Sequence, residues 1–397
     1  MQSINKHHIV LASLDTCTGC SACADVCPKQ CIAFKPKGMF LYPEIDEELC
    51  IGCERCMKAC PVVTPKDNER NSFTQHYFLA VNRDEEERMK ATSGGVGGAL
   101  AKYAIEQGYY VCGASFDGEW YLRHTVSNTL ELLDKIRGSK YLQSDTTGIF
   151  REILSLVDKG EKILFIGTPC QVEALLRVIP KRLHSQLLTC AIICHGVPSP
   201  LVWKEYVKFL EKKHKSKLVN YNFRSKAKGW GRLFIDYRFN KGSKIVVPSW
   251  RNHFHTWFGK HLTLRECCLH CVYRQEQRLS DITIGDFWGI ERVLPHYNAS
   301  KGASALVTSS ERGQQFTQDN PYLELQEVEA KKTSMVLKGY IDRQPEWKKE
   351  EEMSQSKQFE HDFMEHDFDT FIRLYPIQTY WQRSMSFVRL KLQRLLR

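Results

Sequence analysis

The chain has 397 residues, of which 16 are cysteines. This length suits two or three domains with a sizeable core. Hydrophobic residues make up 42% and charged residues 26%, which excludes a disordered or fibrous chain. The first residues contain no apolar signal-peptide core, and no run of about 18 apolar residues predicts a transmembrane segment. We therefore expect a cytoplasmic protein, in which so many cysteines indicate metal binding rather than disulfides.

The net charge of +10 comes from one segment of the chain. Residues 1–75 hold 8 basic and 9 acidic residues, whereas residues 201–278 hold 18 basic and 5 acidic ones. A basic segment predicts an anionic partner, such as a phosphate-bearing cofactor, an anionic small-molecule substrate or an acidic protein. Nucleic acid is disfavoured as that partner, because no helix-turn-helix, zinc-finger or ribonucleoprotein motif accompanies the charge.

The strongest motif is an internal repeat with an offset of 33 residues. CTGCSACADVCP (17–28) and CIGCERCMKACP (50–61) both follow the pattern C-x₂-C-x₂-C-x₃-C-P. In this pattern the first three cysteines wrap one [4Fe–4S] cluster, and the fourth points to the other cluster. Zinc is the rival metal, but it prefers two well-separated pairs of ligands. The expected ligand sets are Cys17, Cys20, Cys23 and Cys60 for one cluster, and Cys27, Cys50, Cys53 and Cys56 for the other.

Over roughly residues 14–66, this doubled motif resembles the bacterial two-cluster ferredoxins. Gly19 and Gly52 are expected to let backbone N–H groups approach the cluster sulfides. Cys31 lies outside the pattern, so we expect it to be a small buried side chain rather than a ligand.

After a polar linker at 65–75, short apolar runs alternate with helical patterns. Buried strands that alternate with helices indicate an α/β domain with a mainly parallel sheet. The predicted strands are Tyr77–Val81, Tyr109–Ser115, Lys162–Ile166 and Leu187–Ile193, and the predicted helices are Gly97–Gln107, Gln171–Ile179 and Leu201–Lys212.

A β-rich part follows, and after about residue 340 the chain becomes charged and helix-forming. That charge predicts a helical tail with a solvated face. The fold class is therefore α+β with several domains: a ferredoxin-like unit at 1–75, an α/β domain at 76–340 and a helical tail at 341–397. The strands predicted in the β-rich part are Leu218–Phe223, Arg232–Phe239, Asp281–Ile284 and Ala303–Thr308.

Four further cysteines have unusual surroundings. Cys170 follows a buried strand through Gly-Thr-Pro into a helix, and Cys194 also follows an apolar strand. The sites of α/β sheets lie at such strand ends. Cys268 and Cys271 form a C-x₂-C pair after Arg265. These residues leave three interpretations open: a third cluster, a thioredoxin-like dithiol at the pair, or buried structural thiols.

Three other motifs suit a cofactor. TSGGVGGALAKYAIEQG (92–108) enters a helix through glycines, where exposed N–H groups suit a phosphate. A flexible loop with close helix packing explains it equally well. GDFWGI (285–290) places an acid and two aromatic rings at a strand end, where rings either stack on a planar cofactor or belong to the core. FRSKAKGW (223–230) lies in the basic segment and would suit an anionic group.

Taken in order, these motifs resemble the beta subunit of the coenzyme F420-reducing hydrogenases and dehydrogenases over about residues 76–310. That resemblance implies a flavoprotein that binds FAD and a [4Fe–4S] cluster and passes electrons between the cluster and a hydride acceptor or donor. The motifs that carry it are TSGG (92–95), GSKYLQS (138–144), GTPCQ (167–171), CHGVPSP (194–200), FRSKAKGW (223–230), RECCLHC (265–271) and DITIGDFWG (281–289).

On this sequence the resemblance implies Cys170, Cys194, Cys268 and Cys271 as ligands of a third cluster. Cys267 departs from the pattern and competes with Cys268, which is preferred because it gives C-x₂-C. Cys112 and Cys190, like Cys31 and Cys267, are then left as structural thiols. The implied FAD contacts are Thr92, Ser93, Gly94, Gly95, Ser139, Lys140 and Tyr141, with Asp286 and Trp288 as further wall residues.

The sequence thus predicts an iron–sulfur flavoprotein oxidoreductase that exchanges electrons with a redox partner protein or ferredoxin. Its substrate would be an anionic molecule such as coenzyme F420 or another organic hydride donor or acceptor, and no catalytic residue is assigned. The alternative is a non-catalytic electron-transfer subunit of a larger redox complex. A peripheral membrane role would rest on the basic, amphipathic segment SMSFVRLKLQRLLR (384–397), for which docking on protein is the more ordinary explanation.

Overall fold

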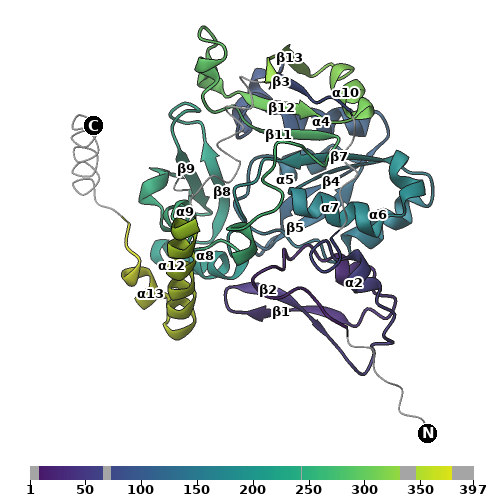
Figure 1. Ribbon diagram of the computed structural model, residues 1–397. Coiled ribbons are helices and arrows are strands. Elements are labelled where there is room, and N and C mark those ends of the chain that lie inside the picture. Colours follow the sequence, from purple (N-terminus) through teal and green to yellow (C-terminus); the bar gives the residue numbers. More distant parts are fainter. Residues whose placement is uncertain (1–8, 66–72, 243, 331–345, 378–397) are drawn as a thin grey trace.

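The computed structural model describes residues 9–65, 73–242, 244–330 and 346–377. These residues form an N-terminal unit that carries the cysteine repeat, a body built on a large sheet, a smaller sheet, and C-terminal helices (Figure 1). The predicted α+β architecture, with a ferredoxin-like unit before a larger α/β body, is confirmed.

The N-terminal unit repeats its backbone as well as its sequence. Gly19 and Gly52 both have φ of +66°, and Ser21 and Glu54, which precede the two short helices, have φ of 62° and 59°. Each cysteine loop therefore turns through left-handed conformations into a helix. The unit consists of helices α1 (Ala22–Asp25) and α2 (Arg55–Ala59) and the antiparallel strands β1 (Ile32–Lys37) and β2 (Phe40–Ile45).

The large sheet has eight strands in the order β13-β3-β12-β11-β7-β6-β4-β5. Its four central strands, β11, β7, β6 and β4, are parallel, as the apolar runs predicted. The flanking pairs are antiparallel, and β3 runs in the same direction as the central strands because β12 opposes both β3 and β11. The strands are β3 (His76–Asn82), β4 (Tyr110–Phe116), β5 (Leu122–Ser127), β6 (Ile163–Gly167), β7 (Leu187–Ile192), β11 (Ile282–Asp286), β12 (Ser304–Thr308) and β13 (Leu323–Glu327).

Helices cover both faces of the large sheet. Apolar side chains of α4, α5 and α10 share one core with the sheet, and those of α6 and α7 share another. The helices of this body are α3 (Glu85–Lys90), α4 (Val96–Glu106), α5 (Glu131–Ile136), α6 (Ile149–Val157), α7 (Pro169–Val178) and α10 (Glu311–Gln318).

The β-rich part predicted after the α/β core does not form one unit. Two of its strands, β11 and β12, insert into the large sheet, whereas the other two pair with each other, and one of them also pairs with a strand that the sequence pattern missed. That missed strand is short, with a half-exposed alternation too weak to predict. The smaller antiparallel sheet contains β8 (Leu218–Ser225), β9 (Phe234–Phe239) and β10 (Lys244–Pro248), next to helices α8 (Pro200–His214) and α9 (His253–Gly259).

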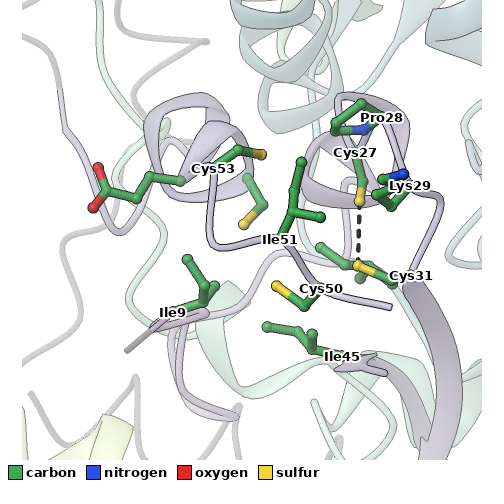
Figure 2. Close-up of a pocket in the computed structure, with 12 residues that line it drawn as sticks. Ile9, Cys27, Pro28, Lys29, Cys31, Ile45, Cys50, Ile51 and Cys53 are labelled. Carbon is green, nitrogen blue, oxygen red and sulfur yellow. Dashed lines mark hydrogen bonds between the residues drawn. The ribbon is translucent and has the colours of Figure 1, made fainter. Parts of the chain in front are cut away.

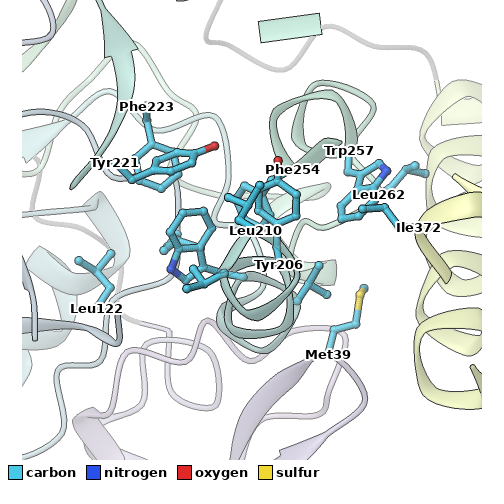
Figure 3. Close-up of a cluster of buried hydrophobic side chains, with 14 of the residues drawn as sticks. Met39, Leu122, Tyr206, Leu210, Tyr221, Phe223, Phe254, Trp257, Leu262 and Ile372 are labelled. Atoms are coloured by element: carbon cyan, nitrogen blue, oxygen red, sulfur yellow. The ribbon is translucent and has the colours of Figure 1, made fainter. Parts of the chain in front are cut away.

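The predicted charged tail is helical, but it packs on the body. Phe359 and Phe371 are fully buried, with ring centroids 5.4 and 5.5 Å from that of Trp257 on α9. These two C-terminal helices therefore complete an aromatic core with the smaller sheet, which also contains Ile372 (Figure 3). They are α12 (Glu346–Glu365) and α13 (Phe368–Leu374). The amphipathic segment 384–397 lies outside the described residues.

The N-terminal unit shares its hydrophobic cores with the body. Met39 and Phe40 join the core of the smaller sheet, and Cys20, Ala22 and Ala59 join the core of α6 and α7. These shared cores hold the unit against the body. Among the described helices, none has both the length and the apolarity that a bilayer span would require.

Candidate functional site

The first cysteine set comes together as the motif predicts. One cavity is lined by Cys17, Cys20, Cys23 and Cys60, together with apolar side chains. Cys17 and Cys20 lie on the loop into α1, Cys23 lies in α1, and Cys60 caps the end of α2, so the short helices bring distant parts of the repeat together. Burial raises the pKa of the Cys20 thiol to about 11.

The second set lines a separate cavity (Figure 2). Its members are Cys27, Cys50, Cys53 and Cys56, and Cys53 is exposed to solvent. Cys31 also lines this cavity, with its Sγ 3.4 Å from the Sγ of Cys27. Cys31 is buried, as predicted, but it lies directly beside a predicted ligand.

The third set gathers at the ends of the central strands. Cys170 follows β6 at the start of α7, and Cys194 follows β7. Both line one cavity with Cys268 and Cys271, which lie in and just after the short 3₁₀ helix Glu266–Cys268. The wall of this cavity also includes Thr16, Thr18, Pro61 and Val62 of the N-terminal unit. The third set therefore lies at the boundary between the unit and the body, beside the loop of the first set.

The neighbouring thiols Cys267 and Cys268 both reach this cavity. Cys267 donates a hydrogen bond to Cys268, which lowers the pKa of the Cys268 thiol to about 7. Burial raises the pKa of Cys194 to about 12, the nearby Cys268 and Cys271 add to this rise, and Arg274 opposes it. No three His, Cys, Asp or Glu side chains of the described part of the chain converge as ligands of a single metal ion.

The glycine-rich loop at 92–95 is explained by packing. A Cβ on Gly94 would come within 2.5 Å of the Ala80 carbonyl oxygen, and Gly95 has φ of +81° with Asn82 against it. Gly94 N donates to Ser304 Oγ over 2.9 Å, and the loop presses on β3 and β12. Close packing against β3 and β12, together with the positive φ of Gly95, therefore requires glycine at these two positions.

The same loop contacts the second predicted FAD segment. The backbone N–H of Ser139 donates to Thr92 Oγ1 over 2.7 Å, and Ser93 Oγ donates to the Ala303 carbonyl oxygen over 2.5 Å. The segment 92–95, the segment 139–141 and the start of β12 therefore form one connected wall.

Beside this wall lies a basic pocket. Ser139 and Lys140 line it, together with four more basic side chains and two acidic ones. Burial lowers the pKa of Lys140 to about 7; the pKa of Lys226 is also about 7, through burial and the nearby Arg88. The pocket would therefore gain positive charge when an anion binds and raises these pKa values. The remaining charged lining residues are Lys90, Arg137, Lys244, Asp134 and Asp236.

Tyr141 and Asp286 meet at a buried arginine. Arg224 Nη1 donates to Tyr141 Oη over 2.9 Å and to Asp286 Oδ2 over 2.8 Å. Three polar atoms at this site are buried without a hydrogen-bond partner: Arg224 Nη2, Asp286 Oδ1 and Trp230 Nε1. Trp288 stacks on Trp230, with ring centroids 4.5 Å apart. Such unpaired buried polar atoms are costly in a native protein unless a ligand satisfies them.

The sheet topology explains why these segments lie near one another. The strands β3, β6, β7 and β11 run in one direction, so the segments that follow them emerge at the same edge. A chain of rings also joins the third cysteine set to the arginine site: His195 contacts Phe258, and Phe258 stacks on Tyr141 with centroids 5.0 Å apart.

Sequence reasoning missed the side chains that hold the first cysteine loop against the body. Four consecutive carbonyl oxygens of this loop, those of residues 17–20, accept hydrogen bonds from Arg265, Gln143 and Thr146. Arg265 and Gln143 lie within motifs that carry the family resemblance, yet only the fold brings them to this loop. We name these three residues the clasp.

Three family models match the chain. Residues 160–331 match the model that describes the C terminus of the beta subunit of coenzyme F420 hydrogenase/dehydrogenase. Residues 16–63 match a 4Fe-4S dicluster domain, and residues 42–109 match a second model of that description. A comparison with curated proteins gives no match.

Solved structures also resemble the chain. One belongs to the F420-reducing [NiFe] hydrogenase complex from Methanosarcina barkeri, studied by xenon derivatization. The identity is 19%, the alignment covers 75% of this chain and 95% of that chain, and the TM-score is 0.44.

The family matches coincide with the cysteine sets. The match at 16–63 includes all eight cysteines of the repeat, and the match at 160–331 includes the four of the third set. The chain therefore carries a 4Fe-4S dicluster domain, and its residues 160–331 are similar to the C terminus of the beta subunit of coenzyme F420 hydrogenase/dehydrogenase.

Proposed function

We propose that this protein is an FAD-dependent iron–sulfur oxidoreductase that passes electrons between an anionic organic hydride donor or acceptor and a redox partner protein. In this proposal the doubled motif holds two [4Fe–4S] clusters, and Cys170, Cys194, Cys268 and Cys271 hold a third. The observation that carries the proposal is the arrangement of the cysteines: three sets line three cavities, and the third cavity is bounded by the loop of the first set.

The chemistry of the third set supports cluster binding. Its cavity brings together thiols from three separate segments, which a structural role for isolated thiols does not require. A thioredoxin-like dithiol would need only Cys268 and Cys271, and would leave Cys170 and Cys194 unexplained. Cys268 is preferred to Cys267 as the ligand because of the C-x₂-C spacing and its proximity to Cys194.

The residues around Arg224 and the basic pocket support FAD. A bound flavin exchanges electron pairs with organic molecules and single electrons with iron–sulfur clusters. Arg224 and Asp286 would offer hydrogen bonds to the polar edge of a flavin, because each has an unpaired buried atom. Lys140 would bind the pyrophosphate or an anionic substrate, and Lys226, which donates to three backbone carbonyl oxygens, would add positive charge to the pocket. The ring contacts from His195 to Tyr141 support a short separation between this site and the third set.

Iron, sulfide and flavin content after anaerobic purification tests the proposal. We expect about twelve irons and one FAD per chain, and about eight irons with FAD retained in Cys170→Ala and Cys271→Ser. Unchanged iron in both variants would eliminate the third cluster, and about four irons in the unmodified protein would overturn the whole assignment. Turnover is measured with coenzyme F420, NADH and NADPH. A fully loaded protein that turns over none of them would favour the alternative of a non-catalytic subunit.

The pH dependence of flavin binding tests the basic pocket. Lys140 and Lys226 have pKa values near 7, so above pH 7 they lose protons and attract an anion less strongly. We expect FAD affinity, measured by fluorescence quenching on flavin-depleted protein, to fall about threefold to tenfold between pH 6 and pH 8. Lys140→Met should flatten this dependence, whereas Lys135→Met, at an exposed position on α5, should leave it unchanged. A pH-independent affinity would contradict the assignment of this pocket.

A further inference from the structure

Arg265 is a fully buried arginine at the boundary between the N-terminal unit and the body. Its Nε donates to the Cys17 carbonyl oxygen over 2.6 Å, and Nη2 donates to the Leu41 carbonyl oxygen over 3.1 Å. Nη1 donates to Gln143 Oε1 over 2.8 Å. The guanidinium also lies over the ring of Tyr42, 4.1 Å from its centroid.

These partners leave the charge of Arg265 without a carboxylate. Each hydrogen-bond acceptor above is neutral, and no carboxylate of the described residues forms an ion pair with this guanidinium. A fully buried and unbalanced charge is strongly destabilising, so a buried arginine normally has an anionic partner. The fold keeps Arg265 buried despite this cost, which indicates that an anion belongs nearby.

The thiol of Cys17 is the group that meets this need. Nη2 of Arg265 lies 3.6 Å from Cys17 Sγ, and Cys17 is one of the four cysteines of the first set. Four thiolates around an iron–sulfur core carry a net negative charge, which becomes more negative when the cluster is reduced. A fixed positive charge in a low-dielectric boundary therefore stabilises the reduced form more than the oxidised form.

Glycine at position 19 makes this approach possible. A Cβ there would lie 2.0 Å from Gln143 Nε2 and 2.9 Å from Arg265 Nη1. Gln143 Nε2 in turn donates to the Thr18 and Gly19 carbonyl oxygens over 3.2 and 3.3 Å. The absence of a side chain at position 19 therefore leaves room for Gln143 and Arg265 beside the loop of the first set.

We propose that Arg265 is a positioning residue that raises the reduction potential of the cluster held by Cys17, Cys20, Cys23 and Cys60 and holds that cluster's loop beside the third cysteine set. This inference rests on the proposed function, because it takes the first set as cluster ligands. It assigns a specific electrostatic role to a side chain that binds no iron itself. The cluster of the second set receives no such charge from Arg265.

The test is a redox titration of the full-length, anaerobically purified protein, followed by electron paramagnetic resonance. Arg265→Met removes the guanidinium and its charge but keeps an unbranched apolar side chain about as long as the arginine stem. We expect one of the two ferredoxin-type potentials to fall by about 59 mV. At the unmodified midpoint, the ratio of reduced to oxidised cluster then falls about tenfold. The other potential should not move.

Three further variants separate charge from packing. Arg265→Lys keeps the charge and should restore most of the potential, and Gln143→Met removes hydrogen bonds without charge and should shift it less. Arg265→Gln provides a second neutral variant if Arg265→Met does not assemble. Full iron content with unshifted potentials in a neutral variant overturns the role of Arg265. Fewer than eight irons in the unmodified protein would instead overturn the cluster assignment, so the two failures are distinguishable.

Discussion

The two halves of the cysteine repeat have the same spacing and backbone conformation but opposite surroundings. The first half packs on the body, where the clasp binds its loop, and its cysteine Cys20 is buried. The loop that begins the second half faces solvent: Cys53 is exposed, and Leu49 and Ile51 near it are 55% and 59% exposed, whereas Ala59 at the end of α2 still packs on the body. The same cysteine spacing and backbone conformation thus produce one site that is buried against the body and one that lies near the surface. Only the contacts with the body make the two sites different.

This difference gives the proposed electron path an order. The first set adjoins the cavity of Cys170 and Cys194, whereas the second set has the exposed cysteine. We therefore place the first cluster between the third cluster and the second cluster, and the second cluster at the surface where a partner protein docks. Three predictions test this order.

The largest effect is expected from removing one ligand in each half. Cys20→Ser and Cys53→Ser should each lose about four irons. Reduction through FAD should still reach the first cluster in Cys53→Ser but should no longer reach the second cluster in Cys20→Ser. Electron paramagnetic resonance after anaerobic reduction by the substrate measures which cluster is reduced. The opposite pattern would reverse the order, and the iron content of each variant is its control.

A smaller effect is expected at one pair of equivalent positions in the repeat. Asp25 has a fully buried side chain and accepts hydrogen bonds from Gly148 N and Phe150 N at the start of α6, over 2.7 and 2.9 Å. Its counterpart Lys58 has a side chain that is 70% exposed. Asp25→Ala should destabilise the protein by about 1–3 kcal/mol because two buried donors lose their acceptor.

Lys58→Ala should change stability by less than about 0.5 kcal/mol, as most surface substitutions do. The measurement is the urea midpoint of cluster absorbance loss, with both variants compared under identical anaerobic conditions. Equal falls in the urea midpoint for the two variants would show that the two halves of the repeat contact the body equally. That result would contradict the difference in burial described above.

The smallest effect is expected at the exposed apolar side chains of the second half. Ile51→Glu should weaken electron transfer to a ferredoxin-type acceptor by up to about tenfold, because docking would lose about 1.4 kcal/mol of apolar contact. Stopped-flow kinetics at several acceptor concentrations measures this loss. Leu130→Glu is the matched control, since Leu130 is 51% exposed and lies outside the N-terminal unit. An equal loss in both variants would exclude a specific docking surface at the second half.

The sequence pattern predicted the strands that consist of continuous apolar runs. The strands predicted near Tyr77, Tyr109, Lys162 and Leu187 are all present to within a residue or two, because buried parallel strands have a strong composition signal. The strands β1, β2, β5, β10 and β13 were missed, because short, half-exposed strands have little periodicity. The sequence also grouped β11 and β12 with β8 and β9, although they belong to different sheets.

The sequence by itself determined the cysteine chemistry. The doubled spacing predicts each set of four cysteines through local loops and short helices, so Cys17, Cys20 and Cys23 can be proposed as ligands without knowing the fold. Tertiary structure decided which half of the repeat faces the body, and it brought Arg265 and Gln143 to the first loop from more than 100 residues away. The physical reason is that local spacing sets the conformation of a loop, whereas burial and charge at that loop depend on which distant segments pack against it.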